Sequence, residues 1–456
     1  MSSETKATDL KRAIGFWGGT AIVVGCVIGS GIFRTPSSIA HVLQDPPLII
    51  ALWIGAGLLC LCGALTLAEL GTMMPKTGGT YVFLRAAYGD AAAFTFGWLY
   101  IVAAIPSGLA ALAAFFGELT LHLCGIEQAA QSDVMIQIIA SAMLIVLSLI
   151  NIRGVELGTL VQTSFTVIKT IAVALVIFVA FFLLKGQINN FAPVEGGVTQ
   201  NGGFYGLAAA VAFVFWTYNG WVYIGYVAGE LENPEKRIKP ILITGVLIIM
   251  SLYVLANLAY LYIYPIKTMT SKMVAQDLVS LAFGPAGGFI VSLAIIMSVF
   301  GATNGTILTN SRVAYAMSRD SLTFSFLGHV NPRWATPDIS IIIQGTIAVL
   351  MVNWLGNYEA ITSYFVVVEW SALIFTIAAV YVLRKKLPNE PRPYHVPGYP
   401  WIPLIFVVGT SLGLTAIVLS RIKLNDDYDP LFGLIIAALG FPIYYIWQAI
   451  RRKRTS

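Results

Sequence analysis

Three of the long apolar stretches in this chain carry polar or flexible residues near their middles, where a small molecule could bind. Gly29-Ser30-Gly31 interrupts the first stretch, Asn219-Gly220 interrupts a later one, and Lys169 stands about halfway along a third. Glycine in a helix interior costs about 1 kcal/mol relative to alanine, so the two glycine-containing runs are predicted to break their helices. Broken backbone inside a bilayer needs protein or water to satisfy its polar groups, and the breaks therefore predict a cavity.

The two predicted breaks offer complementary polar groups to a ligand. The half-helix that follows the first break would point unpaired N–H groups and the positive end of its dipole into the cavity, which suits a carboxylate. The carbonyl groups of the unwound segments would accept hydrogen bonds from an ammonium group. We therefore expect the cavity to bind a small zwitterion without using a charged side chain.

Two ionisable residues, Lys169 and Glu369, fall well inside apolar stretches. An ionisable side chain is costly at that depth, and by default it faces the interior of the helix bundle and marks function. For Glu369 two roles stay open, an interior hydrogen bond or a proton relay.

The composition identifies a polytopic membrane protein. Hydrophobic residues make up 57% of the 456 residues and charged residues 11%, whereas soluble proteins are about one quarter charged. The mean hydropathy is +0.80. Because a helix needs about 20 apolar residues to cross a bilayer, the apolar runs predict an all-α membrane protein with twelve transmembrane helices: 13–42, 47–74, 90–122, 133–151, 157–184, 204–230, 238–265, 286–317, 338–355, 360–383, 401–420 and 431–450.

The placement of lysine and arginine predicts the orientation. With the amino terminus inside, 20 of them fall on inner segments and six on outer loops, among them Arg34. This bias predicts a multi-pass protein of the cell membrane with both termini in the cytoplasm. The net charge of +5 then reflects topology and contact with lipid head groups, and it predicts no nucleic-acid binding.

Nothing in the sequence supports an enzyme. The four histidines, His41, His122, His329 and His395, lie at span ends or in loops, so no metal set or pair of histidine and acid converges in the membrane. We expect no catalytic residue, no metal and no cofactor.

An Asn- and Gly-rich loop from 186 to 203 divides the chain into two comparable hydrophobic parts. Each part begins with an interrupted span. This arrangement is typical of transporters that are built from inverted repeats and have the binding site at the repeat interface. We expect a first repeat of five helices in 1–185, a second and inverted one in 186–386, and two additional helices in 387–456.

Five motifs occur in order along nearly the whole chain and together resemble one family. They are Gly29-Ser30-Gly31-Ile32-Phe33, the run from Glu69 to Gly79, the run from Glu232 to Arg237, the run from Ser311 to Asp320, and the run from Arg392 to Pro400. This set resembles the amino acid-polyamine-organocation (APC) superfamily of permeases. The segments Asn219-Gly220-Trp221 and 300–305 look most like the L-type amino acid transporters and their bacterial relatives.

The resemblance implies the LeuT-type fold, a 5+5 inverted repeat with discontinuous helices 1 and 6. It implies that the substrate carboxylate binds backbone N–H groups around Gly29, Ser30 and Gly31. It places the substrate ammonium on carbonyls near Val27, Trp216 and Asn219, and it gives Trp216 the part of an aromatic gate. The full set of substrate-binding residues expected in this way is Val27, Ile28, Gly29, Ser30, Gly31, Trp216, Asn219, Gly220 and Trp221.

Lys169 corresponds, by this resemblance, to a lysine that stands where sodium-coupled relatives hold an ion. Its ammonium is expected to bond carbonyls at the first break and an oxygen of span eight, Thr303, with Asn304 in the same site. Two roles stay open for Lys169: a fixed tether, or a group that loses its proton on burial and couples transport to pH. At Val222 the sequence departs from relatives with a polar or acidic residue, which argues for neutral substrates.

These inferences predict a sodium-independent exchanger of neutral L-amino acids that works by alternating access. The alternatives are a proton-coupled amino acid symporter that uses Lys169 and, more remotely, an amino acid sensor of the same fold. The expected partners are the amino acid and the lipid bilayer. The resemblance leaves two alternatives open: an accessory single-span subunit attached through Cys124, or a protein that stands alone like the bacterial members. Which amino acids are carried does not follow from the sequence.

Overall fold

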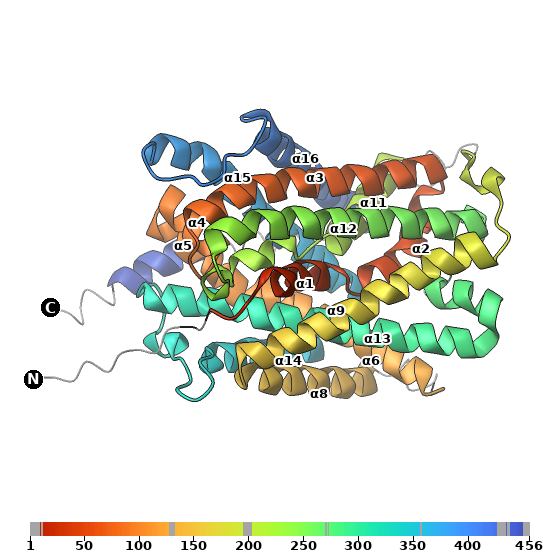
Figure 1. Cartoon of the computed structure of the whole chain (residues 1–456), viewed down its shortest axis with the longest axis horizontal. Helices are drawn as coiled ribbons and strands as arrows, with labels where there is room; N and C mark the ends of the chain where they lie inside the picture. The colour runs from red at the N-terminus through yellow and green to blue at the C-terminus, as the bar shows by residue number, and fades with distance from the viewer. Residues whose placement is uncertain are drawn as a thin grey trace, which may run out of the picture.

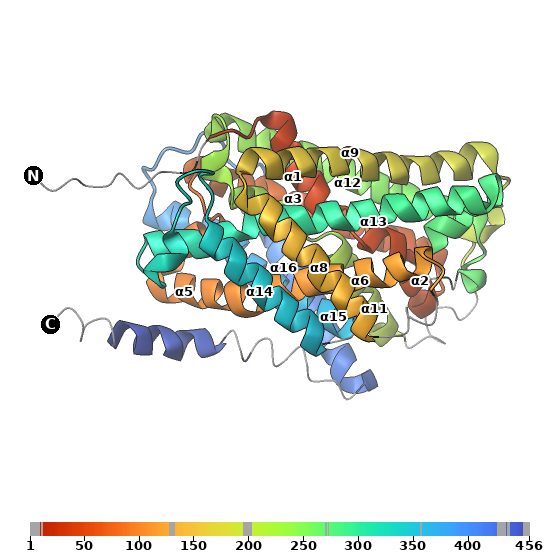
Figure 2. The ribbon, with the colours of Figure 1, turned by 90° about the horizontal axis from the view of Figure 1, so that it is seen from below.

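The computed structural model describes residues 10, 12–126, 133–194, 203–269, 271, 273–355, 358–425, 435 and 438–449. Within these residues the regular elements are helices, joined at one point by an isolated bridge between Ile14 and Leu231 (Figures 1 and 2). The α-helices are α1 Phe16–Val27, α2 Gly31–Leu43, α3 Pro46–Met73, α4 Thr80–Tyr88, α5 Asp90–Leu99, α6 Ile105–Leu123, α8 Asp133–Ile152, α9 Val155–Phe178, α11 Phe204–Thr217, α12 Pro234–Ile263, α13 Val274–Arg319, α14 Asp338–Leu355, α15 Tyr358–Lys386 and α16 Trp401–Asn425. The short π- and 3-10 helices are η1 Tyr100–Ala104, η2 Val179–Leu183, η3 Ile188–Phe191, η4 Trp221–Gly225, η5 Ala228–Glu230, η6 Ile266–Thr268 and η7 Ser325–Gly328.

Ten helical segments in the described part of the chain are long and apolar enough to cross a membrane. Ten of the twelve predicted spans correspond to these segments. For the span predicted at 338–355, the apolar helix Asp338–Asn353 is shorter than the other ten. The span predicted at 431–450 lies partly outside the described residues, and its described part at 438–449 is helical. The all-α membrane protein is therefore confirmed, and the described residues include ten helices that could span a membrane.

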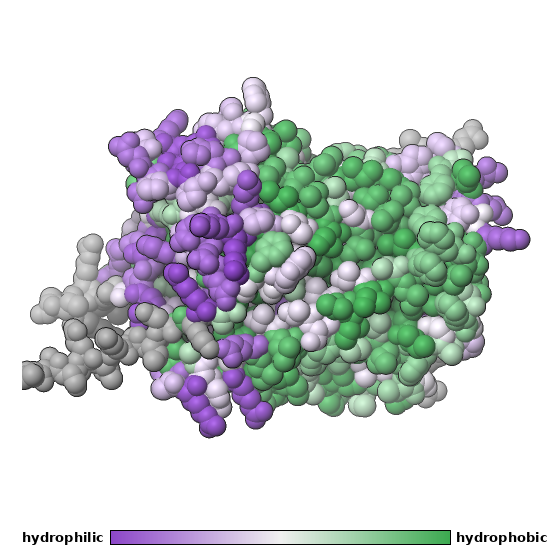
Figure 3. All heavy atoms as spheres, in the orientation of Figure 1, coloured by the Kyte–Doolittle hydropathy of each residue, from purple (hydrophilic) through white to green (hydrophobic). Residues whose placement is uncertain are grey.

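The surface agrees with a bundle that lies in a bilayer. A broad apolar band covers the middle of the molecule in Figure 3, and hydrophilic side chains gather mainly at one end. That end carries Glu69, Glu230, Arg312 and Arg384, and we call it the Glu69 end. Inside the bundle α12 packs along α3, α13 along α9, and α11 against α2 (Figure 1).

Two of the spans are discontinuous at the places predicted. The first consists of α1 and α2, which are separated by 28–30, and Ile28 has an extended conformation with ψ of 92°. In the second, α11 ends at Thr217, the chain turns through 218–220, and η4 begins at Trp221. Both interruptions coincide with the glycine-containing runs, as expected from the weak helix preference of glycine.

The two breaks touch each other, and glycine is what allows it. Gly220 has φ of +116°, and a Cβ atom there would lie 3.0 Å from the carbonyl carbon and oxygen of Cys26. A Cβ atom on Gly31 would lie 2.7 Å from the side chain of Thr217. The end of α1 thus packs on the turn after α11, while the start of α2 packs on the end of α11.

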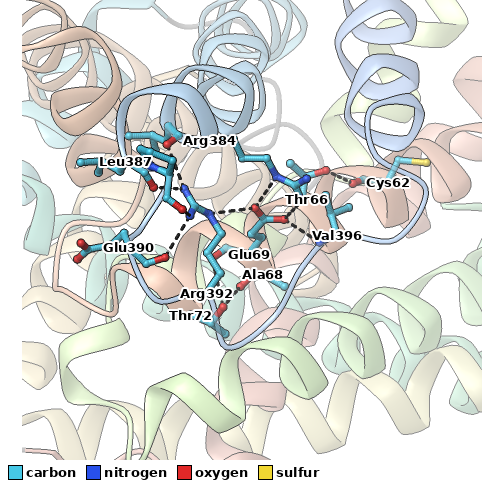
Figure 4. Close-up of polar contacts among 12 residues, drawn as sticks. Cys62, Thr66, Ala68, Glu69, Thr72, Arg384, Leu387, Glu390, Arg392 and Val396 are labelled. Carbon is cyan, nitrogen blue, oxygen red and sulfur yellow. Dashed lines mark hydrogen bonds and ion pairs between the residues drawn. The ribbon is translucent and has the colours of Figure 1, made fainter.

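Buried ion pairs join helices at the Glu69 end. The Glu69 carboxylate accepts hydrogen bonds from Arg384 Nε at 2.9 Å and Nη2 at 2.7 Å, and from the Val396 N–H at 2.7 Å (Figure 4). It thereby holds α3, α15 and the segment after α15 together. The Glu230 carboxylate accepts from Arg312 Nε and Nη2 at 2.8 and 3.0 Å, with both side chains fully buried.

One charged residue lies elsewhere than predicted. Arg34, which the sequence analysis assigned to an outer loop, is buried on α2 and forms an ion pair with Glu118 on α6, with 2.9 Å between Nη1 and Oε2. Its place in the loop count was wrong, because Arg34 lies inside the first span, on α2. A carboxylate within reach explains why an arginine can be buried there.

The contact between the breaks can be tested with Gly220→Ala. The new methyl group meets the Cys26 carbonyl, and the backbone conformation is unfavourable for alanine, so we expect a loss of about 1–3 kcal/mol in the free energy of unfolding. The measurement is the midpoint of thermal unfolding of the purified protein. Gly55→Ala on α3 is the matched control, because a Cβ there meets nothing within 4 Å. Equal midpoints for the two variants would contradict the tight contact.

Candidate substrate cavity

A cavity lies at the meeting point of the two broken spans. Both breaks line it, together with residues of α6, η4, α13 and α15. The lining residues are Cys26, Val27, Gly29, Ser30, Gly31, Gly108, Leu112, Trp216, Thr217, Asn219, Tyr223, Thr306 and Phe365. None of these side chains carries a full charge, so the polar groups of the cavity come from backbone, hydroxyl and amide groups.

One wall of the cavity is the start of α2. Gly29, Ser30 and Gly31 line it, and Ser30 is the N-cap residue of this helix of 13 residues. The first N–H groups of a helix lack partners on a preceding turn, and the dipole adds positive potential there. This wall is therefore suited to a carboxylate, and Gly29 and Gly31 leave its backbone open to close approach.

Another part of the lining, contributed by the second break, carries hydrogen-bond acceptors. The Asn219 side chain lines the cavity and donates from Nδ2 to the Tyr223 hydroxyl at 2.9 Å, while its buried Oδ1 atom has no partner. The Trp216 carbonyl, for which the sequence analysis expected an ammonium ligand, already accepts from the Asn219 N–H at 3.2 Å. Asn219 Oδ1 is therefore a buried acceptor without a protein partner on a residue that lines the cavity.

Tyr253 on α12 ties the two breaks together behind the cavity. Its hydroxyl lies 2.9 Å from the Val27 carbonyl and 3.2 Å from the Thr217 carbonyl. A hydroxyl has one proton, so it donates to one of these carbonyls at a time. The ring is held by edge contacts with Trp53 and Tyr218. Sequence patterns gave no sign of this residue, because a tyrosine in an apolar helix is ordinary core material.

Two aromatic rings cover part of the cavity. The Trp216 ring meets the Phe365 ring of α15 edge to face, with 5.3 Å between centroids. Phe365 also lies against Gly108 on α6, where a Cβ would come within 2.9 Å of its ring. Trp216 and Phe365 therefore line the cavity together through an aromatic contact.

Lys169 is fully buried on α9 and binds the end of α1, which confirms that it faces the bundle interior. Its ammonium donates to the Gly25 carbonyl, to the Ile28 carbonyl at 2.8 Å, and to the Ser298 carbonyl of α13 at 3.4 Å. Three N–H donors thus meet three backbone acceptors from two helices. The carbonyls of Gly25 and Ile28 are available because α1 stops before it can bond them.

The residues expected beside Lys169 on span eight lie differently. The oxygen of span eight that accepts from Lys169 is the Ser298 carbonyl, so the expectation of Thr303 was wrong; the Thr303 hydroxyl donates to the Val299 carbonyl of its own helix. Asn304 accepts from Asn151 at 2.8 Å and donates to the Gly158 carbonyl at 3.0 Å. Asn304 therefore joins α13 to α8 and α9 and does not line the cavity.

Of the nine predicted substrate residues, six line the cavity: Val27, Gly29, Ser30, Gly31, Trp216 and Asn219. Ile28 turns its carbonyl to Lys169, Gly220 packs on Cys26, and Trp221 is buried against Gly63 and Phe406. The other seven lining residues, among them Tyr223 and Thr306, were not predicted as substrate residues. Tyr223 lies on the short helix η4, which begins directly after a turn, so no helical periodicity in the sequence indicated which way its side chain faces.

Glu369 on α15 is buried and accepts a hydrogen bond from the Tyr100 hydroxyl at 2.9 Å. This confirms an interior hydrogen bond, the first of the two roles predicted for it. Its other oxygen, Oε2, has no partner.

Known proteins resemble this chain over nearly its whole length. A family model described as amino acid permease matches residues 14–441. The serine/threonine exchanger SteT of Bacillus subtilis is 32% identical over 99% of this chain and 100% of its own length. The b(0,+)-type amino acid transporter 1 of Mus musculus is 30% identical, with 98% of this chain and 90% of the relative covered. The cystine/glutamate transporter of Homo sapiens is 28% identical, with 96% and 86% covered.

The helical bundle, the apolar surface and the uncharged cavity between two broken spans agree with these matches. The relatives named are amino acid exchangers or transporters, and none is an enzyme. The chain belongs to the amino acid permease family of the APC superfamily, and it is an integral membrane protein of amino acid transport.

Proposed function

We propose that this protein is a sodium-independent exchanger of neutral L-amino acids. The amino acid would lie in the cavity with its carboxylate on the N–H groups of Gly29, Ser30 and Gly31. Its ammonium would lie toward Asn219 Oδ1, which is buried and has no partner in the protein. A lining that offers both donors and acceptors matches a zwitterion, and the exchanger activity of the relative SteT supports the proposal.

The observation that carries sodium independence is the ammonium of Lys169 on the carbonyls of Gly25 and Ile28. A sodium ion in a sodium-coupled carrier would place a positive charge on main-chain carbonyls at a helix break, and here the ammonium group takes that place. A protonated lysine supplies this charge without a sodium gradient. If the ammonium stays charged, it acts as a tether and the carrier exchanges; if it releases its proton, the carrier is a proton symporter, the second candidate.

Neutral substrates are favoured by the lining of the cavity. The thirteen lining residues include no aspartate, glutamate, lysine or arginine. Val222, where an acidic anchor would lie in relatives that carry cations, is buried and apolar. A charged substrate side chain would thus lose its hydration without gaining a partner.

We further propose the LeuT-type architecture with twelve spans and alternating access. The repeats would be 1–185 and 186–386, each opened by a broken span, and 387–456 would add two helices. The meeting of the two breaks at one cavity supports this arrangement. The Lys and Arg bias supports a place in the cell membrane with both termini, and the Glu69 end, in the cytoplasm.

An accessory subunit is a further part of the proposal. Cys124 is exposed at the end of α6, where a disulfide to a partner could form. One relative, 28% identical over 98% of this chain and 83% of its own length, is named large neutral amino acids transporter small subunit 2 of Oryctolagus cuniculus. An amino acid sensor of the same fold is the remote alternative.

Exchange can be measured by counterflow in proteoliposomes without sodium, after a thermal-shift screen against the twenty amino acids has chosen the substrate. We expect labelled amino acid to leave loaded vesicles rapidly only when unlabelled amino acid is present outside. Uptake into empty vesicles driven by an inward proton gradient would instead establish the symporter. Binding without any flux would favour the sensor.

The tether is tested by Lys169→Met, which keeps the length of the side chain but removes its three donors. The Gly25 carbonyl then loses its buried partner, so we expect counterflow to fall to the level of empty vesicles. Lys185→Met, at an exposed position after η2, is the control and should exchange normally. Retained exchange in Lys169→Met would refute both roles proposed for this lysine.

The gate is tested by Trp216→Ala and Trp216→Phe. An indole that covers the substrate contributes apolar burial of about 1.5–3 kcal/mol, so the alanine variant should raise KM about tenfold or more. The phenylalanine variant should raise it less. Trp401→Ala, at an exposed tryptophan, should leave KM unchanged. An unchanged KM in Trp216→Ala would remove the gate from the proposal.

A further inference from the structure

Glu369 is buried with incomplete hydrogen bonding. Its side chain is 1% exposed, it accepts one hydrogen bond, and its second oxygen has none. Within the described part of the chain no lysine, arginine or histidine forms an ion pair with it. An ionised carboxylate without a counter-charge is strongly disfavoured in a dry interior, whereas the protonated acid is tolerated.

Hydroxyl groups connect Glu369 to the region between the substrate cavity and the Glu69 end. Tyr226 donates to the Tyr100 hydroxyl at 2.8 Å, and Tyr100 donates to Glu369. The Thr80 hydroxyl lies 3.4 Å from that of Tyr226. On the other side the Tyr226 ring stacks on Tyr223, with 5.6 Å between centroids, and Tyr223 lines the substrate cavity.

Tyr226 lies between Tyr223, which lines the substrate cavity, and the segment at Gly78 and Gly79, which is next to a second cavity at the Glu69 end. The Gly78 N–H donates to the Tyr226 carbonyl at 3.0 Å, and a Cβ on Gly79 would lie 2.5 Å from the Tyr226 ring. The second cavity is lined by Thr77 and Val82, which come before and after Gly78 and Gly79 in the sequence. Separating Tyr226 from Tyr100 would therefore expose Glu369 to water from that end.

Among the described residues, Tyr100, Tyr223 and Tyr226 interact electrostatically with Glu369. Tyr100 comes from η1, and Tyr223 and Tyr226 come from η4 and the residue that follows it. On α4, which packs against α15, Arg85 is bound to Asp90 and Asp320. On α3, Glu69 is bound to Arg384, near the far end of α15. These charges are already paired and do not compensate a charge on Glu369.

We propose that Glu369 is a proton-binding site that controls closure at the Glu69 end. The inference rests on the proposed alternating access. While Tyr100 and Tyr226 are in contact the carboxyl group is protonated. When they separate, the O–H bond breaks, the proton passes to water on that side, and a carboxylate remains. The contact closes again after a proton from the same side has restored the acid, so no net proton crosses the membrane.

This site predicts how exchange depends on pH. A carboxylate in contact with water has an ordinary pKa near 4.3, so the protonated fraction needed for closure falls about tenfold per pH unit above it. Exchange in the wild type should therefore decline as the pH rises on both sides of the vesicle membrane. A neutral side chain at this position needs no proton, so exchange should then be independent of pH within about twofold.

The experiment is counterflow between pH 5.5 and 8.5 in the wild type, Glu369→Gln and Glu369→Met. Glu390→Gln, at an exposed position after α15, is the control and should keep the wild-type profile. Two neutral substitutions are used because one could disturb packing. If exchange still declines with pH in both Glu369 variants, the pH dependence belongs to another group, such as Lys169, and the proposal is overturned. A flat profile in the wild type also overturns it.

A second readout does not depend on transport. Infrared spectra of the purified protein at pH 7 should contain the C=O band of a protonated carboxylic acid that is absent in Glu369→Gln and present in Glu390→Gln. Identical bands in all three proteins would overturn the proton site. If the wild type shows no exchange, the proposed function fails, and the infrared band still decides whether Glu369 holds a proton.

Discussion

The need to satisfy main-chain carbonyls inside a membrane governs this structure. Where α1 ends, the carbonyls of Gly25, Val27 and Ile28 have lost their helical partners, and lipid cannot replace them. Lys169 donates to the first and the last, and Tyr253 donates to the second. Both donors come from other helices, so the break can exist only while α9 and α12 stay packed against α1.

The same constraint explains why the cavity contains no charged side chain. A helix start supplies N–H groups on one wall, and Asn219 supplies an amide oxygen on the other. Charged side chains lie outside the cavity lining: Lys169 binds the carbonyls at the break, and the ion pairs Arg312–Glu230 and Arg384–Glu69 lie at the Glu69 end. Charge therefore stabilises the helices, while backbone and amide dipoles are left to meet the ligand.

Much of this arrangement could be predicted from the sequence, and the part that could not has physical reasons. Apolar length predicted the spans, and glycine in mid-span predicted the breaks, because both are local properties. The partner of Lys169 was predicted wrongly as Thr303, since a side-chain oxygen is visible in a sequence while the backbone oxygen of Ser298 is not. Tyr223, Tyr253 and Thr306 were missed because their position depends on how helices distant in the sequence pack around the breaks.

The most direct test is an experimental structure of the protein with the transported amino acid, determined in sodium-free buffer. The account predicts the substrate carboxylate at the start of α2, its ammonium near Asn219, and the ammonium of Lys169 on the carbonyls of Gly25 and Ile28. An amino acid bound elsewhere, or a first span that remains helical through 28–30, would contradict it.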